Sequence, residues 1–112
     1  MSAIGEKNAQ LAWVMVQHAD HRPDLQIRVL GLMRPMVEKG EVSPWMYAYL
    51  FDRVNVGLGL PQLYGTQFHC VNGNLEHAAL ERPGEVDALR RSMGMGPLKN
   101  YKVGSPDGKC EG

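Results

Sequence analysis

The sequence predicts a small, mostly helical α+β domain with three helices, one β-hairpin and a short C-terminal helix. Apolar residues recur at helical spacing through the first half of the chain. An Asn-Gly pair, the strongest two-residue signal for a hairpin turn, follows in the second half. The 112 residues fit one domain. We expect this domain to span residues 1–103, with a disordered Gly- and Pro-rich tail over residues 104–112.

Two helices are predicted before residue 41. Residues 6–19 and residues 24–40 both carry apolar side chains at the spacing of an amphipathic helix. Pro35 should kink the second helix or restart it, because proline lacks the N–H that a helix interior needs. Gly40 is a suitable C-terminal stop for this helix.

The third helix has the clearest start. Ser43 suits the N-cap, and Pro44 suits the first helical position, where the missing N–H costs nothing. The helix should end at Gly57 or Gly59. A short helix is then predicted over residues 83–93, before the chain reaches its tail.

The hairpin is predicted around Asn72-Gly73, because both turn positions must accept a positive φ. The register around this turn divides the flanking residues between two faces. One face, which we expect to point to the core, carries Tyr64, Thr66, Phe68, Cys70, Leu75, His77 and Ala79. The other face carries Gln67, His69 and Glu76.

Charge and hydropathy narrow the classes of partner. Twelve basic residues balance twelve acidic ones, whereas a nucleic-acid partner or an anionic membrane favours an excess of Lys and Arg. We therefore expect neither partner. No apolar run approaches the roughly 20 residues of a membrane span, and the first residues do not resemble a secretory signal. The expected location is the cytoplasm, and a net charge near zero is compatible with a homodimer.

The two cysteines, Cys70 and Cys110, are expected to be free thiols in a reducing compartment. A bridge between them is the alternative, and it would only tether the tail. Neither their spacing nor their neighbours indicate a zinc site.

Three polar side chains occupy unexpected positions on the predicted helices. At about 100° per residue, His18 and Arg53 each fall in the middle of an apolar arc, and Asp52 falls at the edge of one. A buried guanidinium needs a partner. The candidates in this chain are Asp20, Asp52 and Tyr64, and an anionic ligand is the other candidate, since Arg binds carboxylates and phosphates bidentately.

Four segments in order support a resemblance: VQHAD, KGEVSPWMYAYLFDRV, GLPQLYGTQF and RPGEVDALRRSMGMGPLKNY. Together they resemble a bacterial family known only as a domain of unknown function, with the pattern QHAD … DRV … PQxYGTQ … VDxxRxxxGxxPL. The resemblance covers about residues 4–101 and implies no activity. It implies a set of recurring positions, which here are Gln17, His18, Ala19, Asp20, Asp52, Arg53, Gln62, Tyr64, Gly65, Thr66 and Gln67.

These residues predict a small polar pocket between the first helix, the third helix and the YGTQ segment. We expect it to bind an anionic or amide-bearing small molecule or peptide, and to catalyse hydrolysis or proton transfer without a cofactor. His18 would be the general acid/base, oriented by Asp20 or Asp52. Tyr64 would donate a hydrogen bond to developing charge.

The predicted substrate-binding residues are Gln17, Arg53, Thr66 and Gln67. Arg53 would anchor a carboxylate or phosphate. The hairpin register puts Gln67 and Tyr64 on opposite faces, so either one of the two assignments is wrong or the strand bulges at Gly65.

Other interpretations remain open for the same residues. A metal on His18, Asp20 and His21 is a weak alternative, because no second His/Cys cluster is present. The pocket could bind its ligand without catalysis, or the polar residues could form a structural network that supports a partner-binding protein. Arg53 could then simply be half of an ion pair, and Asp20 a helix cap.

Overall fold

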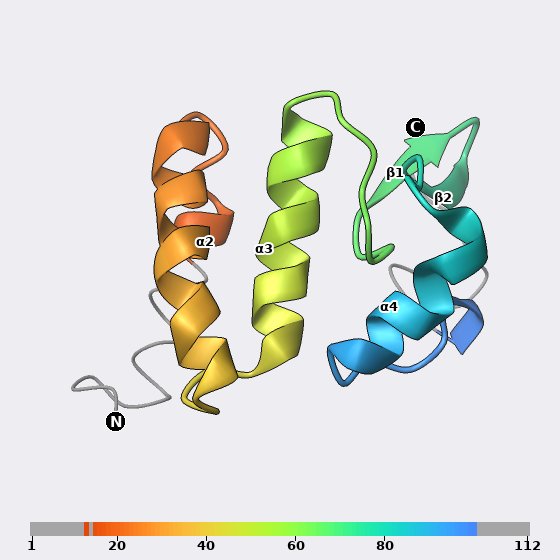
Figure 1. Cartoon of the computed structure of the whole chain (residues 1–112). Helices are drawn as coiled ribbons and strands as arrows, with labels where there is room; N and C mark the ends of the chain where they lie inside the picture. Colours follow the sequence, from red (N-terminus) through yellow and green to blue (C-terminus); the bar gives the residue numbers. More distant parts are fainter. Residues whose placement is uncertain (1–12, 14, 101–112) are drawn as a thin grey trace.

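Helix α3 (Pro44–Gly57) lies at the centre of the fold. In the computed structural model, which describes residue 13 and residues 15–100, it runs between α2 (Pro23–Glu38) and the C-terminal half of the chain (Figure 1). That half contains strands β1 (Phe68–Val71) and β2 (Asn74–His77), helix α4 (Val86–Ser92), and the short 3-10 turns η1 (Pro83–Glu85) and η2 (Leu98–Asn100). Helices with one antiparallel hairpin confirm the predicted α+β class.

Helix α2 continues through Pro35 without a break, so the expected restart does not occur. Both Pro35 and Gly31, the residue whose carbonyl loses its helical partner, are exposed, and water can satisfy that carbonyl. The helix ends at Glu38, and Gly40, the predicted stop, turns the chain just beyond it with a φ of +75°. The N–H of Glu41 donates to the carbonyl of Met36 at 2.8 Å, which closes the last turn.

Helix α3 begins at Pro44 and ends at Gly57, as the sequence predicts. Ser43 is in the N-cap position, although its side chain makes no capping hydrogen bond. The apolar core forms where α3 packs on α2. Its buried members are Leu30, Met33, Val42, Met46, Leu50 and Val54.

The hairpin has the predicted register. Phe68 pairs with His77 and Cys70 with Leu75, and the turn residue Asn72 has a positive φ of 52°. The strand is shorter than expected, because residues 64–67 form an irregular loop in front of it.

Cys70 is disulfide-bonded, so the expectation of a free thiol there is wrong. Disulfides persist mainly in oxidising compartments, and the cytoplasmic location stays a prediction.

Some expectations fall outside the described residues. Of the predicted helix over residues 6–19, residue 13 and residues 15–17 are helical, and residues 6–12 and 14 are not described. The tail over residues 104–112 is not described either. Within the described residues, no helix has the length and apolar character to cross a membrane.

Candidate functional site

Helix α3 separates the residues that were predicted to share one pocket. Its Arg53 lies on the face that meets the end of the first helical segment, where Gln17, His18 and Asp20 also lie. The carboxylate of Asp52 instead faces the loop after α3. This division follows from helix geometry, since adjacent residues differ by about 100° in direction.

Gln17, His18 and Arg53 line a pocket of about 400 Å³, which we call the aromatic pocket, and Asp20 lies beside it without lining it. Its lining consists of Trp13, Gln17, His18, Trp45, Tyr49 and Arg53. Trp13 is held by a hydrogen bond from its Nε1 to the carbonyl of Met46 at 2.9 Å. Its ring meets Trp45 and Tyr49 edge to face, with centroids 5.5 and 5.8 Å apart. The pocket therefore has rigid aromatic walls with polar groups beside them.

Arg53 is paired with Asp20, one of the three partners that the sequence left open. The guanidinium donates from Nε to Oδ1 at 3.0 Å and from Nη2 to Oδ2 at 2.8 Å. The side chain of Gln26 also donates to Asp20, and it donates to the carbonyl of Val16 as well. The hydrogen bond from Arg53 is the main reason that the pKa of Asp20 lies below its ordinary value of 3.8.

The lowered pKa predicts how this ion pair depends on pH. Its stabilising effect should be present above pH 3.8 and lost as pH falls through the lowered pKa of Asp20. Because both groups contact solvent, Asp20→Asn should cost at most about 1 kcal/mol at neutral pH. Urea unfolding of wild type and Asp20→Asn from about pH 7 to about pH 2.5 measures this difference. A difference that grows toward acid would contradict the assignment.

Gln17 is the most unusual residue of the aromatic pocket. It is only 4 % exposed, and its amide oxygen has no hydrogen-bond partner among the residues that the structure describes. A buried acceptor without a donor costs about 1–3 kcal/mol. Such a group is a candidate for contact with a ligand, because a ligand N–H could supply the missing donor.

His18 lies on the rim of this pocket and is exposed, so its predicted interior position is wrong. The helical residues end at Gln17, and the helical wheel therefore does not govern the direction of the next side chain. His18 lies close enough to Asp20 for its charge to lower the pKa of that carboxyl. Within the described part of the chain, His18 forms no hydrogen bond that would fix its tautomer.

Asp52 is fully buried, and it anchors the loop after α3 rather than the aromatic pocket. Its carboxylate accepts from the N–H groups of Leu63 at 2.8 Å, Tyr64 at 3.0 Å and Thr66 at 3.1 Å. It also accepts from the Thr66 hydroxyl at 2.9 Å. Burial raises the pKa of this carboxyl, and the hydrogen bonds act in the opposite direction. Asp52 therefore does not orient His18.

Thr66 and Gln67 extend this loop network. The side-chain amide of Gln67 donates to the Thr66 hydroxyl oxygen at 3.0 Å. Gln62, which is fully buried, accepts from the Gln67 N–H and donates to the carbonyls of Gln67 and Ala78. The conflict between Gln67 and Tyr64 disappears because Gly65, with a φ of +69°, turns the chain before the strand begins. Neither Thr66 nor Gln67 lines the aromatic pocket.

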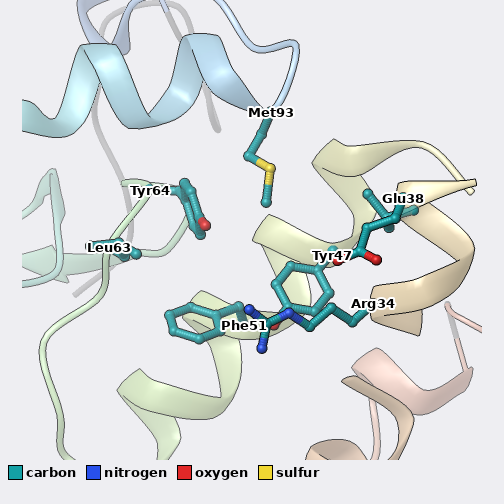
Figure 2. A pocket seen from close by; sticks show the side chains of 8 residues that line it. Arg34, Glu38, Tyr47, Phe51, Leu63, Tyr64 and Met93 are labelled. Atoms are coloured by element: carbon teal, nitrogen blue, oxygen red, sulfur yellow. The ribbon is translucent and has the colours of Figure 1, made fainter. Parts of the chain in front are cut away.

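Tyr64 lines a different pocket on the other side of α3, which we call the tyrosine pocket. It has a volume of about 390 Å³ (Figure 2). Its lining consists of Arg34, Val37, Glu38, Tyr47, Phe51, Leu63, Tyr64 and Met93. The ring of Tyr64 meets Phe51 edge to face, with centroids 5.9 Å apart. Tyr64 is therefore not available to a ligand beside His18.

The aromatic walls and the charged residues of α2 were not predicted as site residues from the sequence. Trp45, Tyr49 and Arg53 follow one another at a spacing of four residues, which places them along one helix face. That spacing was a usable signal, but it also fits a core stripe. Arg34 and Glu38 show the same spacing on α2, where it is typical of an ordinary solvated face.

The described residues contain no group of three or more His, Cys, Asp and Glu side chains that could hold a metal ion. The alternative of a metal on His18, Asp20 and His21 therefore has no support from the geometry. The carboxylate of Asp20 is already engaged by Arg53 and Gln26.

Comparison with known proteins identifies one family. A family of unknown function (DUF6624) matches residues 2–107, which is nearly the whole chain. No curated protein and no solved structure gives a significant match. The family match agrees with the resemblance to a domain of unknown function, and it assigns no activity to the chain.

Proposed function

Because the chain belongs to the DUF6624 family, whose function is unknown, we propose a function from the aromatic pocket itself. The pocket binds a small amide-bearing molecule or a short peptide, with the apolar part of the ligand against the aromatic walls. The observation that carries this proposal is the buried amide oxygen of Gln17, which has no donor among the described residues. A ligand N–H would satisfy it.

Arg53 supplies the complementary group. A guanidinium carries five N–H donors, and the two bonds to Asp20 use Nε and Nη2. No described residue accepts from Nη1, so its donors remain for an acceptor on the ligand. An amide offers an acceptor and a donor together, and so fits Arg53 and Gln17 at once.

The charge balance favours a neutral amide over an anion. Asp20 already neutralises Arg53 in a bidentate pair, so an incoming carboxylate would meet a pair with little net charge. It would also lie near the negative charge of Asp20. This narrows the class expected from the sequence, which included both anionic and amide-bearing ligands.

Binding can be measured by tryptophan fluorescence, since both tryptophans of the chain line this pocket. Phenylacetamide and phenylacetate form a matched pair of probes that differ in one polar group. We expect phenylacetamide to bind with roughly millimolar affinity, and phenylacetate about tenfold more weakly. Equal affinities of the two probes, or no change in fluorescence with either, would contradict the proposal.

Gln17→Leu tests the residue that carries the proposal. It should weaken phenylacetamide binding about tenfold and raise the free energy of unfolding by about 1 kcal/mol, because it removes a buried acceptor that has no donor among the described residues. Binding is followed by fluorescence, and stability by urea unfolding. If the same change lowers stability and leaves binding intact, Gln17 is a structural residue.

A second candidate function is amide hydrolysis, and the position of His18 favours it. His18 lies on the rim of the same pocket, near the negative charge of Asp20. As a general base, the imidazole takes a proton from water while the water oxygen attacks the amide carbonyl, and it then passes this proton to the leaving nitrogen, so that the C–N bond breaks and ammonia leaves. The same incubation with phenylacetamide, followed for release of ammonia, tests this. His18→Gln should abolish turnover and leave probe affinity unchanged, whereas absence of turnover in wild type supports binding alone.

A further inference from the structure

The tyrosine pocket shares no lining residue with the aromatic pocket. We propose that it binds a second ligand, a free α-amino acid with an aromatic or branched apolar side chain. Arg34 and the Tyr64 hydroxyl would hold the carboxylate, Glu38 would hold the ammonium group, and the apolar surface between α2 and α3 would take the side chain. This site is independent of the function proposed for the aromatic pocket.

The Tyr64 hydroxyl is a donor that has no acceptor among the described residues. The residue is 8 % exposed, and in the described part of the chain its hydroxyl forms no hydrogen bond. Figure 2 shows the hydroxyl directed into the pocket toward Met93 and Phe51. Burial raises the pKa of Tyr64, so the phenol stays protonated and able to donate. Asp52 accepts a hydrogen bond from the backbone N–H of Tyr64, which positions the backbone from which this side chain extends.

Arg34 faces the same part of the pocket. Its positive charge acts on the Tyr64 hydroxyl and lowers the pKa of that group, against the larger effect of burial. Arg34 makes no ion pair with any described residue. A guanidinium and a phenol that converge on one space are both donors, and a carboxylate can accept from both.

Glu38 selects a zwitterion over a simple carboxylate. It lies one helical turn beyond Arg34 on α2, lines the same pocket, and forms no ion pair with Arg34. A ligand with only a carboxylate would be repelled by Glu38. A ligand that also carries an ammonium group offers each of the two charges an opposite partner.

The remaining wall is apolar. Tyr47 and Phe51 are stacked, with ring centroids 6.1 Å apart, and Met93 closes the opposite side (Figure 2). Flat rings and a flexible thioether make a surface that accepts aromatic or branched side chains. A small polar amino acid would leave this surface uncovered.

The test uses L-phenylalanine as the probe and the ¹³C-labelled methyl group of Met93 as the reporter, with Met93→Leu to assign its signal. We expect saturable shifts in the millimolar range and no change in tryptophan fluorescence. 3-Phenylpropionate, which lacks the ammonium group, should bind about fivefold more weakly, and Glu38→Gln should remove that difference. Tyr64→Phe should weaken the binding of L-phenylalanine about fivefold, because it removes one hydrogen bond of about 1 kcal/mol.

Several results would overturn the proposal. One is the absence of a Met93 shift up to about 20 mM L-phenylalanine, and another is a response in tryptophan fluorescence alone. A third is equal binding of L-phenylalanine and 3-phenylpropionate to the wild type. N-acetyl-L-phenylalanine, which represents the end of a peptide chain, should bind as weakly as 3-phenylpropionate, and tight binding would exclude a free amino acid. Glu81→Gln, an exposed acid outside the pocket, should change none of these affinities. Phenylacetamide binding is followed by tryptophan fluorescence and L-phenylalanine binding by the Met93 signal. Either proposed site can therefore be refuted while the other stands.

Discussion

Replacement of Asp52 by alanine is expected to lower the free energy of unfolding by about 3–5 kcal/mol. The carboxylate is fully buried and accepts from the N–H groups of Leu63, Tyr64 and Thr66 and from the Thr66 hydroxyl. Without it, these donors would lack acceptors, and each unpaired buried group costs about 1–3 kcal/mol. Urea unfolding followed by circular dichroism measures the loss.

Two further variants show whether the loss belongs to this network. Thr66→Val removes only the hydroxyl donor and should cost about 1 kcal/mol. Asp24→Ala removes an exposed carboxylate that pairs with Arg22 at the surface, and it should change stability far less than Asp52→Ala. If Asp52→Ala is no more destabilising than Asp24→Ala, Asp52 does not anchor the loop, and the tyrosine pocket loses the support that orients Tyr64.

Arg90→Met is the second change with a large expected effect, a loss of about 2–4 kcal/mol. Arg90 is 3 % exposed, and its guanidinium donates to the carbonyl of Gly96 at 2.7 Å and to that of Tyr64 at 2.9 Å. The charged donor therefore joins the turn after α4 to the loop after α3. Methionine keeps most of the apolar stem but leaves both carbonyls without this donor.

Arg91 provides a matched control for Arg90, because it is the next residue of α4 and is exposed. Arg91→Met should change stability by no more than about 0.5 kcal/mol. Equal unfolding midpoints for the two variants would show that the buried guanidinium contributes little. A large loss at Arg90 alone would confirm that its carbonyl contacts stabilise the fold.

Asp52 and Arg90 hold the same loop. Asp52 binds its backbone N–H groups, and Arg90 binds its backbone carbonyls. The anion accepts hydrogen bonds from the N–H groups of Leu63, Tyr64 and Thr66, and the cation donates to the carbonyls of Tyr64 and Gly65. Gly65 fits this arrangement because its φ is +69° and an added Cβ would lie 3.1 Å from a methyl group of Leu98. Several positions in the resemblance to the unknown-function family are thus explained by loop structure rather than by chemistry.

Local signals predicted the elements well. The start of α3 at Pro44, its end at Gly57 and the C-terminal stop of α2 at Gly40 depend on backbone preferences of single residues. The hairpin register follows from Asn72-Gly73, because the turn fixes which residues face each other. Pro35 shows the limit of such signals, since an exposed helix face tolerates a proline that a buried one would not.

The sequence by itself determined the α+β class, the helix ends, the hairpin register and most residues of the polar set. Only the tertiary structure decided how that set divides. Asp52 and Arg53 are neighbours in the chain, yet one holds the loop at Leu63 and the other pairs with Asp20, because adjacent helical residues point about 100° apart. Which element packs on each face of α3 depends on contacts between residues far apart in sequence. For the same reason, Gln17 and Tyr64, each with a polar atom that has no hydrogen-bond partner among the described residues, line two pockets on either side of one helix.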